Sequence, residues 1–307
     1  MHWEAMLTTV KNCLRMADKF GRTPYFYLTG GDPILHGDFW RLLKYFKQLQ
    51  IDFTIMGNPF HLNAAVCEQL KDCGCIKYQL SLDGLRKTHD FIRKPGSFDC
   101  TISRIPMLNE AGIVPAIMTT VSELNIAEIP ELIDVVVEHG AGIFAFARFC
   151  PDNANLAIAP AAYRNFLEIC DAKFKKYEQS GCKTWFNKKD HLWKLYEYER
   201  GEFTIPENCD PELVYEGCNC GNCHLTILPD GQVLACRRVR GSQVGNVFKD
   251  DLADLWLHEM EKFRDYQKFK KCSRCELLSW CRGCPAVASS KNGDFYDADP
   301  QCWKNVS

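Results

Sequence analysis

Apolar positions along the first 150 residues alternate between short continuous runs and longer stretches with helical spacing. The short runs, rich in aromatic and β-branched residues, predict strands, and the amphipathic stretches between them predict helices. We expect strands at 24–28, 52–56, 76–82, 114–121 and 142–149. We expect helices at 3–20, 38–49, 63–71, 101–111, 126–139 and 160–181. This alternation predicts a parallel α/β fold whose functional residues lie at the carboxyl ends of the strands.

The pattern changes after residue 181. Residues 182–217 resemble a linker that holds one helix, 191–199, and a cysteine-rich module follows from 218 to 307. Within the module, Asp230-Gly231 separates two apolar segments and predicts a β-hairpin with a two-residue turn. We therefore expect an α/β domain over 1–181, a linker over 182–217 and a small cysteine-rich domain over 218–307.

Composition removes several classes of function. The 307 residues are 46% apolar and 25% charged, with a net charge of −2, so no global charge favours nucleic acid or membrane binding. No apolar run approaches the roughly 20 residues of a membrane helix, and the N-terminal residues lack a secretory pattern. We therefore expect a cytoplasmic protein, with no nucleic-acid or membrane partner. In that reducing compartment its 18 cysteines serve as metal ligands or buried thiols rather than disulfides.

The cysteines are concentrated near the C-terminus. Ten of the 18 fall between Cys209 and Cys302, whereas the others are scattered and predict buried core thiols. Two upstream cysteines, Cys223 and Cys236, flank the predicted hairpin. Five more close the chain at short spacings: Cys272, Cys275, Cys281, Cys284 and Cys302. Such spacing indicates metal binding, but it does not exclude zinc, because four thiolates suit zinc as well as iron–sulfur clusters.

Polar residues and glycines follow several of the predicted strands. Gly30-Gly31-Asp32-Pro33 comes after the first strand, Ser81-Leu82-Asp83-Gly84 after the third, and Arg148 lies in the fifth. Consecutive glycines let the backbone approach a ligand closely and direct its N–H and C=O groups at it. A plain turn is the common alternative for Gly30-Gly31 taken alone.

Taken together, these residues resemble a radical S-adenosylmethionine (radical SAM) enzyme with a C-terminal SPASM domain. Gly30-Gly31-Asp32-Pro33 is similar to the family's Gly-Gly-Glu-Pro motif, and Ser81 with Asp83 matches its Ser-x-Asp-Gly segment. The hairpin, Gly245-Asn246-Val247 and the closing cysteines match the SPASM pattern. The resemblance implies a partial (β/α)6 TIM-like barrel lacking its first strand, followed by a small iron–sulfur domain with a β-hairpin.

The resemblance also implies cofactors and the residues that hold them. SAM is expected to contact Gly30, Gly31, Asp32, Pro33, Ser81, Asp83 and Arg148. Two auxiliary 4Fe–4S clusters are expected, one on Cys272, Cys275, Cys281 and Cys302, the other on Cys218, Cys223, Cys236 and Cys284. We prefer Cys223 because a two-residue turn at Asp230-Gly231 places it diagonally beside Cys236. Cys220 and Cys209 remain possible ligands.

Two departures from the family pattern stand out. Two residues separate Cys281 from Cys284, where the family has three. In addition, the Cys-x-x-x-Cys-x-x-Cys loop for the SAM-cleaving cluster, which precedes the first helix in the family, is missing from the 307 residues. We therefore expect that the natural N-terminus lies upstream and carries a third cluster, and that the chain as printed does not cleave SAM.

The implied function is maturation of a ribosomally made peptide or a protein. The 5′-deoxyadenosyl radical would abstract a hydrogen atom from the substrate, which could be a cysteine-rich peptide, and flavodoxin or ferredoxin would serve as reductant. No residue here identifies the substrate or a catalytic side chain. Two alternatives stay open: a non-catalytic iron–sulfur protein for electron transfer or peptide binding, and a zinc-stabilised binding module.

Overall fold

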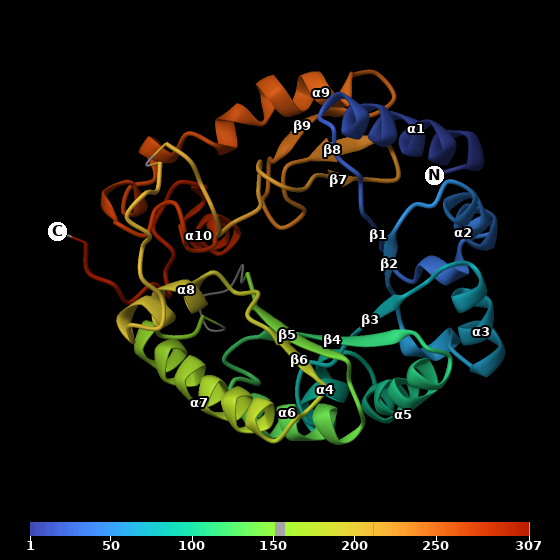
Figure 1. The fold of residues 1–307 in the computed structure, drawn as a ribbon, viewed down its shortest axis with the longest axis horizontal. Helices are drawn as coiled ribbons and strands as arrows, with labels where there is room; N and C mark the ends of the chain where they lie inside the picture. Colours follow the sequence, from blue (N-terminus) through green and yellow to red (C-terminus); the bar gives the residue numbers. More distant parts are fainter. Residues whose placement is uncertain (151–156, 211, 307) are drawn as a thin grey trace. The chain divides into compact units, whose positions relative to one another are not determined.

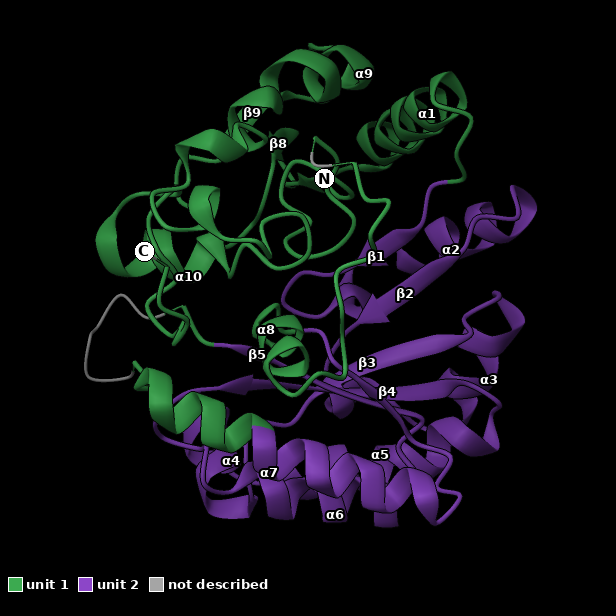
Figure 2. Cartoon of the chain, turned by 60° about the vertical axis from the view of Figure 1, so that its left-hand side comes forward, with its two compact units in different colours: residues 1–23, 149–167, 190–307 green, residues 24–148, 168–189 purple. Residues whose placement is uncertain are grey.

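The computed structural model describes residues 1–150, 157–210 and 212–306, and they form two compact units. Unit 1 comprises residues 1–23, 149–167 and 190–307, and unit 2 comprises residues 24–148 and 168–189 (Figure 2). The units therefore interleave along the sequence, whereas we expected three consecutive segments, 1–181, 182–217 and 218–307.

Unit 2 is built on one six-stranded sheet in which every strand is parallel to its neighbours and follows sequence order (Figure 1). Its strands are β1 (Phe26–Leu28), β2 (Phe53–Met56), β3 (Lys77–Ser81), β4 (Val114–Val121), β5 (Ile143–Arg148) and β6 (Trp185–Asn187). Sequential parallel order is the arrangement of a (β/α) barrel, in which a helix connects each strand to the next. The predicted partial barrel is confirmed.

The helices of unit 2 agree with most of the predicted stretches. They are α2 (Phe39–Gln48), α3 (Ala64–Asp72), α4 (Arg86–Ile92), α5 (Ser97–Glu110), α6 (Ile129–Glu138) and the second part of α7 (Pro160–Gln179). Short 3-10 turns follow two strands, Pro33–Leu35 after β1 and Pro59–His61 after β2. Helix α4 was not predicted, and β6 lies in the segment that we interpreted as a linker. That interpretation is wrong for residues 185–187, which pair with β5.

The core of unit 2 lies between the sheet and its helices. Ile55, Leu80 and Phe144 of three different strands are fully buried, as are Leu43 of α2 and Ile133 of α6. Because all six strands run in the same direction, their carboxyl ends meet at one edge of the sheet. The loops at that edge carry the glycines, carboxylates and hydroxyls noted in the sequence.

Unit 1 gathers the first helix with the C-terminal half of the chain. Its helices are α1 (Trp3–Lys19), the start of α7, α8 (Leu192–Glu199), α9 (Leu252–Asp254) and α10 (Pro285–Asn292). A short π-helical segment, Leu255–Glu259, follows α9, and 3-10 turns lie at Glu261–Phe263, Tyr266–Lys268 and Cys272–Arg274. Its antiparallel sheet has three strands, β7 (Thr226–Ile227), β8 (Gln232–Leu234) and β9 (Gln243–Asn246).

Helix α1 packs on the cysteine-rich part of unit 1. Its Cys13 and Met16 contact a buried cluster that includes Val233, Val247 and Leu252. The Asn12 side chain donates to the backbone oxygen of Val247 (2.8 Å), and Lys19 forms an ion pair with Asp251 (3.0 Å). These contacts explain why α1 groups with unit 1 although it precedes the barrel strands in sequence.

Candidate functional site

Asp32 stands at the carboxyl end of β1 with one oxygen paired and the other without a partner. Its Oδ2 lies 2.8 Å from Nδ1 of His61, which follows β2. The side chain is only 2% exposed, and Oδ1 is buried without a hydrogen-bond partner in the structure. Buried carboxylate oxygens are normally hydrogen-bonded, so an unpartnered oxygen suits a donor that comes with a ligand. The ammonium group of SAM is such a donor, and Asp32 therefore fits the predicted site.

The loop after β2 contacts the motif of residues 30–33 that follows β1. Asn58 donates from its amide nitrogen to the backbone oxygen of Gly31 (2.8 Å). A Cβ on Gly57 would lie 2.0 Å from the Tyr78 hydroxyl oxygen and 3.0 Å from Asp32 Oδ1, so only glycine fits there. Burial raises the pKa of Tyr78, and the nearby Asp32 carboxylate adds to that shift. Sequence reasoning missed these residues because no motif marks them.

Asp83 lies at the same edge of the sheet, but both of its carboxylate oxygens already accept hydrogen bonds from other residues of the chain. Oδ2 accepts from Arg93 (2.6 Å), and Oδ1 accepts from the backbone N–H of Thr120 at the end of β4 (2.8 Å). Its backbone N–H donates to Nδ1 of buried His89 (2.9 Å), and its backbone oxygen accepts from Asn125 (2.8 Å). Asp83 therefore fixes the ends of β3 and β4 relative to α4.

The other predicted SAM contacts lie on the same sheet. Gly30 and Gly31 are exposed after β1, Pro33 begins the 3-10 turn, and Ser81 is half-buried as the last residue of β3. Arg148, the last residue of β5, is buried. Within unit 2 these residues therefore occupy the carboxyl end of the sheet, where the prediction put them, and their contact with SAM stays a prediction.

In unit 1, four cysteines line one cavity: Cys272, Cys275, Cys281 and Cys302, which we call the C-terminal cysteine group. The cavity is completed by Leu195, Leu277, Leu278, Arg282, Gly283 and Lys304. Burial, together with the neighbouring thiols Cys302 and Cys275, raises the pKa of Cys272 to about 12. Burial and neighbouring thiols also raise the pKa values of Cys275 and Cys281, so these thiols are a donor set for a cation that neutralises them. This group fits a cluster and matches the set expected from the sequence.

A second set of cysteines surrounds the hairpin: Cys218, Cys220, Cys236 and Cys284, which we call the hairpin cysteine group. The Cys220 thiol hydrogen-bonds to Cys236, and Cys218 interacts electrostatically with Cys284 and Cys236. The hydrogen bond from Cys220 lowers the pKa of Cys236, while the same bond and burial raise the pKa of Cys220. Arg238 Nη2 lies 3.5 Å from the Cys284 sulfur, and the interaction with Cys284 raises the pKa of Arg238.

The structure does not bring Cys223 into this group. Cys223 is exposed, whereas Cys220 is 3% exposed and contacts Cys236. Our argument for Cys223 assumed a two-residue turn, and that register is wrong. Thr226 pairs with Leu234 and Ile227 with Val233, and Leu228 and Gln232 close a three-residue turn. A shift of one residue turns side chains to the opposite face of a hairpin. Cys209, the other alternative, is half-buried without a described link to the group.

Three further findings concern ligands and surfaces. None of the 18 cysteines forms a disulfide. Within the described part of the chain, no three His, Cys, Asp or Glu side chains converge on a single metal ion. A four-iron cluster binds each thiolate through a different iron, so its ligands lie farther apart than those of one ion. In the same described residues, no helix is both long and apolar enough to cross a membrane.

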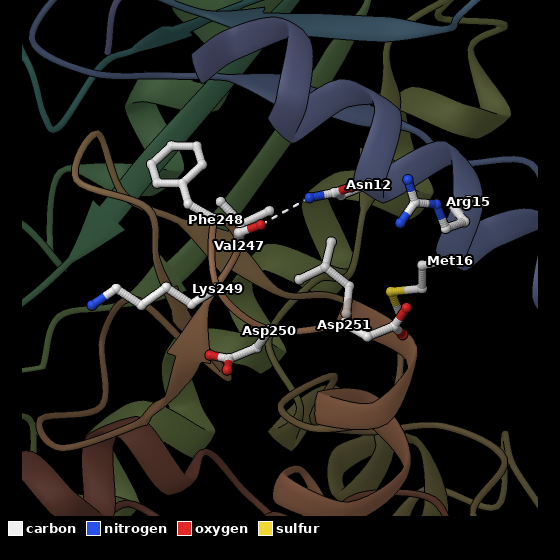
Figure 3. A pocket seen from close by; sticks show the side chains of 9 residues that line it. Asn12, Arg15, Met16, Val247, Phe248, Lys249, Asp250 and Asp251 are labelled. Atoms are coloured by element: carbon white, nitrogen blue, oxygen red, sulfur yellow. Dashed lines mark hydrogen bonds between the residues drawn. The ribbon is translucent and has the colours of Figure 1, made fainter. Parts of the chain in front are cut away.

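A separate pocket of about 220 Å³ lies between α1 and the loop that joins β9 to α9 (Figure 3). It is lined by Asn12, Arg15, Met16 and residues 247–252, and it contains no cysteine. Asn12 uses its side chain to bind Val247, and Asp251 pairs with Lys19 outside the pocket lining. The pocket is therefore part of the contact between α1 and the cysteine-rich module.

The chain combines an α/β sheet that carries a SAM-type motif at its carboxyl edge with a module that holds two cysteine groups. This combination defines an iron–sulfur protein of the SAM-binding class. Comparison with known families agrees. Residues 2–136 match the radical SAM superfamily, and residues 218–285 match SPASM, an iron–sulfur cluster-binding domain. The chain belongs to the radical SAM enzymes that carry a SPASM domain. This membership implies SAM and 4Fe–4S clusters as its cofactors.

Individual relatives cover most of the chain at low identity. The AdoMet-dependent heme synthase of Methanosarcina barkeri is 25% identical over 290 residues, which is 91% of this chain and 82% of the relative. Mycofactocin maturase MftC of Mycolicibacterium smegmatis is 23% identical over 316 residues, covering 96% and 74%. The crystal structure of Streptococcus suis SuiB bound to S-adenosylmethionine has a TM-score of 0.73 at 24% identity, covering 96% and 70%. That structural likeness shows the fold.

Proposed function

We propose that this protein is a radical SAM/SPASM maturase that modifies a ribosomally made peptide or a protein. The observation that carries the proposal is the pair of cysteine groups in unit 1, together with the unpartnered Oδ1 of Asp32 at the sheet edge of unit 2. When bound to a reduced cluster, SAM supplies the 5′-deoxyadenosyl radical that abstracts a hydrogen atom from the substrate.

The chain's own residues bind and orient in this proposal. Asp32 accepts the ammonium group of SAM, while His61 and Asn58 hold Asp32 and Gly31 in place. Ser81 and Arg148 line the same edge, and Asp83 keeps the ends of β3 and β4 in register. The cysteines of the C-terminal group hold one auxiliary cluster. Those of the hairpin group hold the other, with Cys220 in place of Cys223 as ligand.

The SAM-cleaving cluster does not fit the residues present. It needs three cysteines near the carboxyl edge of the sheet, and the 307 residues contain no Cys-x-x-x-Cys-x-x-Cys motif. Cys73 and Cys75 are buried and belong to the core of unit 2. We therefore propose that a polypeptide of these 307 residues alone does not cleave SAM, and that a version extended by such a motif does.

Peptide modification is favoured by two of the relatives. One is the mycofactocin maturase, and the other is SuiB, which has also been crystallised with its precursor peptide SuiA. A second candidate function is modification of a heme precursor, because heme synthases are among the most similar curated relatives. The substrate is thus either a flexible peptide chain or a rigid tetrapyrrole, and one experiment distinguishes these two candidates.

The experiment uses the extended protein with SAM and dithionite under anaerobic conditions. One arm contains the peptide encoded beside the gene, and the other contains an iron-coproporphyrin. The proposal expects 5′-deoxyadenosine and a peptide whose mass falls by the hydrogens removed, with the porphyrin unchanged. Conversion of the porphyrin and not of the peptide would support the second candidate. Formation of 5′-deoxyadenosine by the 307-residue polypeptide would contradict the ligand argument.

Two partners complete the proposal. A one-electron reductant such as flavodoxin or ferredoxin would supply the electrons, and a peptide, which could be cysteine-rich, would be the substrate. Thiolate ligands persist in a reducing compartment such as the cytoplasm, which is where we place the protein.

A further inference from the structure

Arg282 is a buried cation between the two cysteine groups. It lies in the two-residue loop from Cys281 of the C-terminal group to Cys284 of the hairpin group, and it is 4% exposed. Its Nη1 donates to the backbone oxygen of Leu278 (3.0 Å) and its Nη2 to that of Cys218 (3.1 Å). The same guanidinium also lines the cavity of the C-terminal group. One side chain therefore touches the surroundings of both groups.

The position of Arg282 is unusual for its backbone as well. Its φ is 60°, a left-handed conformation that favours glycine, and Gly283 follows with φ 59°. Both residues of the short loop therefore adopt the left-handed conformation. A Cβ on Gly217 would meet the backbone oxygen of Cys281 at 2.4 Å, so the surrounding chain packs closely on the loop. A side chain at a strained site is held there by its surroundings, which here bind the guanidinium.

Within the described part of the chain, no carboxylate lies within ion-pair distance of Arg282. Its neighbours are the two backbone oxygens and the ring of Tyr266, 5.2 Å from the guanidinium carbon. The Tyr266 hydroxyl in turn donates to Asn222 (2.7 Å), whose amide lies 3.3 Å from the Cys218 oxygen. An arginine stays protonated in proteins, and a buried charge requires compensation. Cys218 of the hairpin group interacts electrostatically with Arg282, so thiolates that bind a cluster would supply the compensating negative charge.

We propose that Arg282 is the shared counter-ion of the two auxiliary clusters and sets their reduction potentials. This inference rests on the proposed function, in which both cysteine groups hold clusters. A positive charge beside a cluster favours its reduced, more negative state, so removal of the charge makes reduction harder. Because the guanidinium lies between the groups, both clusters should respond to one substitution.

The test compares midpoint potentials after anaerobic reconstitution, with iron and sulfide counted for each protein. Arg282→Gln should retain the iron of the wild-type chain and shift both potentials to more negative values. Arg282→Lys, which keeps the charge, should return both potentials most of the way to the wild-type values. The matched control is Arg274→Gln, which removes an exposed cation from the loop between Cys272 and Cys275 and should leave both potentials near the wild-type values.

Unchanged potentials in an Arg282→Gln protein with full iron content would overturn the inference. If Arg282→Gln fails to hold iron, Arg282→Lys decides. Retention of iron by the lysine variant supports a role of the charge, and loss of iron from it refutes the counter-ion role. If the wild-type protein binds no iron, both the proposed function and this inference are refuted. If the wild-type protein binds iron but substitution of Arg282 leaves both midpoint potentials unchanged, only this inference is refuted.

Discussion

The choice between Cys220 and Cys223 gives the sharpest test of the hairpin cysteine group. Cys220 is buried and hydrogen-bonded to Cys236, whereas Cys223 is exposed three residues later. Cys220→Ala removes a ligand of one four-iron cluster, so the iron content should fall from about eight to about four per chain. Cys223→Ala should retain about eight. The two variants differ only in which cysteine is changed, so each controls for the other.

The lost packing of the Cys220 side chain does not by itself explain the expected difference in iron content between Cys220→Ala and Cys223→Ala. Cys220→Ala removes one buried sulfur atom, which costs about 1 kcal/mol in packing and changes the stability of the metal-free protein only slightly. Loss of a cluster removes binding free energy that is part of the folding of the module, so the reconstituted Cys220→Ala protein should also unfold at a lower temperature. The assays are iron and sulfide analysis after anaerobic reconstitution, and thermal unfolding of the same samples. Equal iron loss in both variants, or loss only in Cys223→Ala, would refute the assignment of Cys220.

Three other predictions concern unit 2. Gly57→Ala should destabilise the protein by about 1–3 kcal/mol, because its Cβ meets the Tyr78 hydroxyl, and Tyr78→Phe should recover part of this loss in the double variant, measured by urea unfolding. Burial lowers the pKa of His89 below its usual 6.5, so the free energy of unfolding should be steady above pH 6.5 and fall below it as the unfolded chain takes up the proton. His89→Gln should flatten that decline in denaturant titrations across pH 5–8. Arg93→Gln should cost about 2 kcal/mol, because the buried Asp83 carboxylate loses a charged donor, and Arg93→Lys should cost less.

Much of the architecture could be predicted because it depends on local patterns. The strands β1 to β5 were predicted as short segments between amphipathic helices, and this alternation of strands and helices is typical of a parallel α/β fold. β6 was missed because its three residues, 185–187, carry no periodic signal of their own and become a strand only beside β5. Helix α1 has a clear apolar face, but a face does not identify what covers it, and here Cys13 and Met16 pack on the cysteine-rich module.

In the candidate sites, too, features that depend on local spacing could be predicted, and features that depend on contacts between separate segments could not. Cysteine spacing predicted the C-terminal cysteine group, because short intervals within one loop leave few alternatives. The hairpin group depended on a register, and a turn that begins at Pro229 rather than Asp230 changed which cysteine faces Cys236. Gly57 and His61 approach Asp32 only through the neighbouring positions of β1 and β2. Such contacts between separate loops have no sequence motif.

Metal analysis of the reconstituted wild-type chain tests the central claim most directly. If two auxiliary clusters occupy the two cysteine groups, the 307-residue protein should hold about eight iron and eight sulfide ions and absorb near 400 nm as a brown solution. A colourless protein that holds about two zinc ions, with no absorption near 400 nm, would contradict the account and favour a zinc-stabilised binding module.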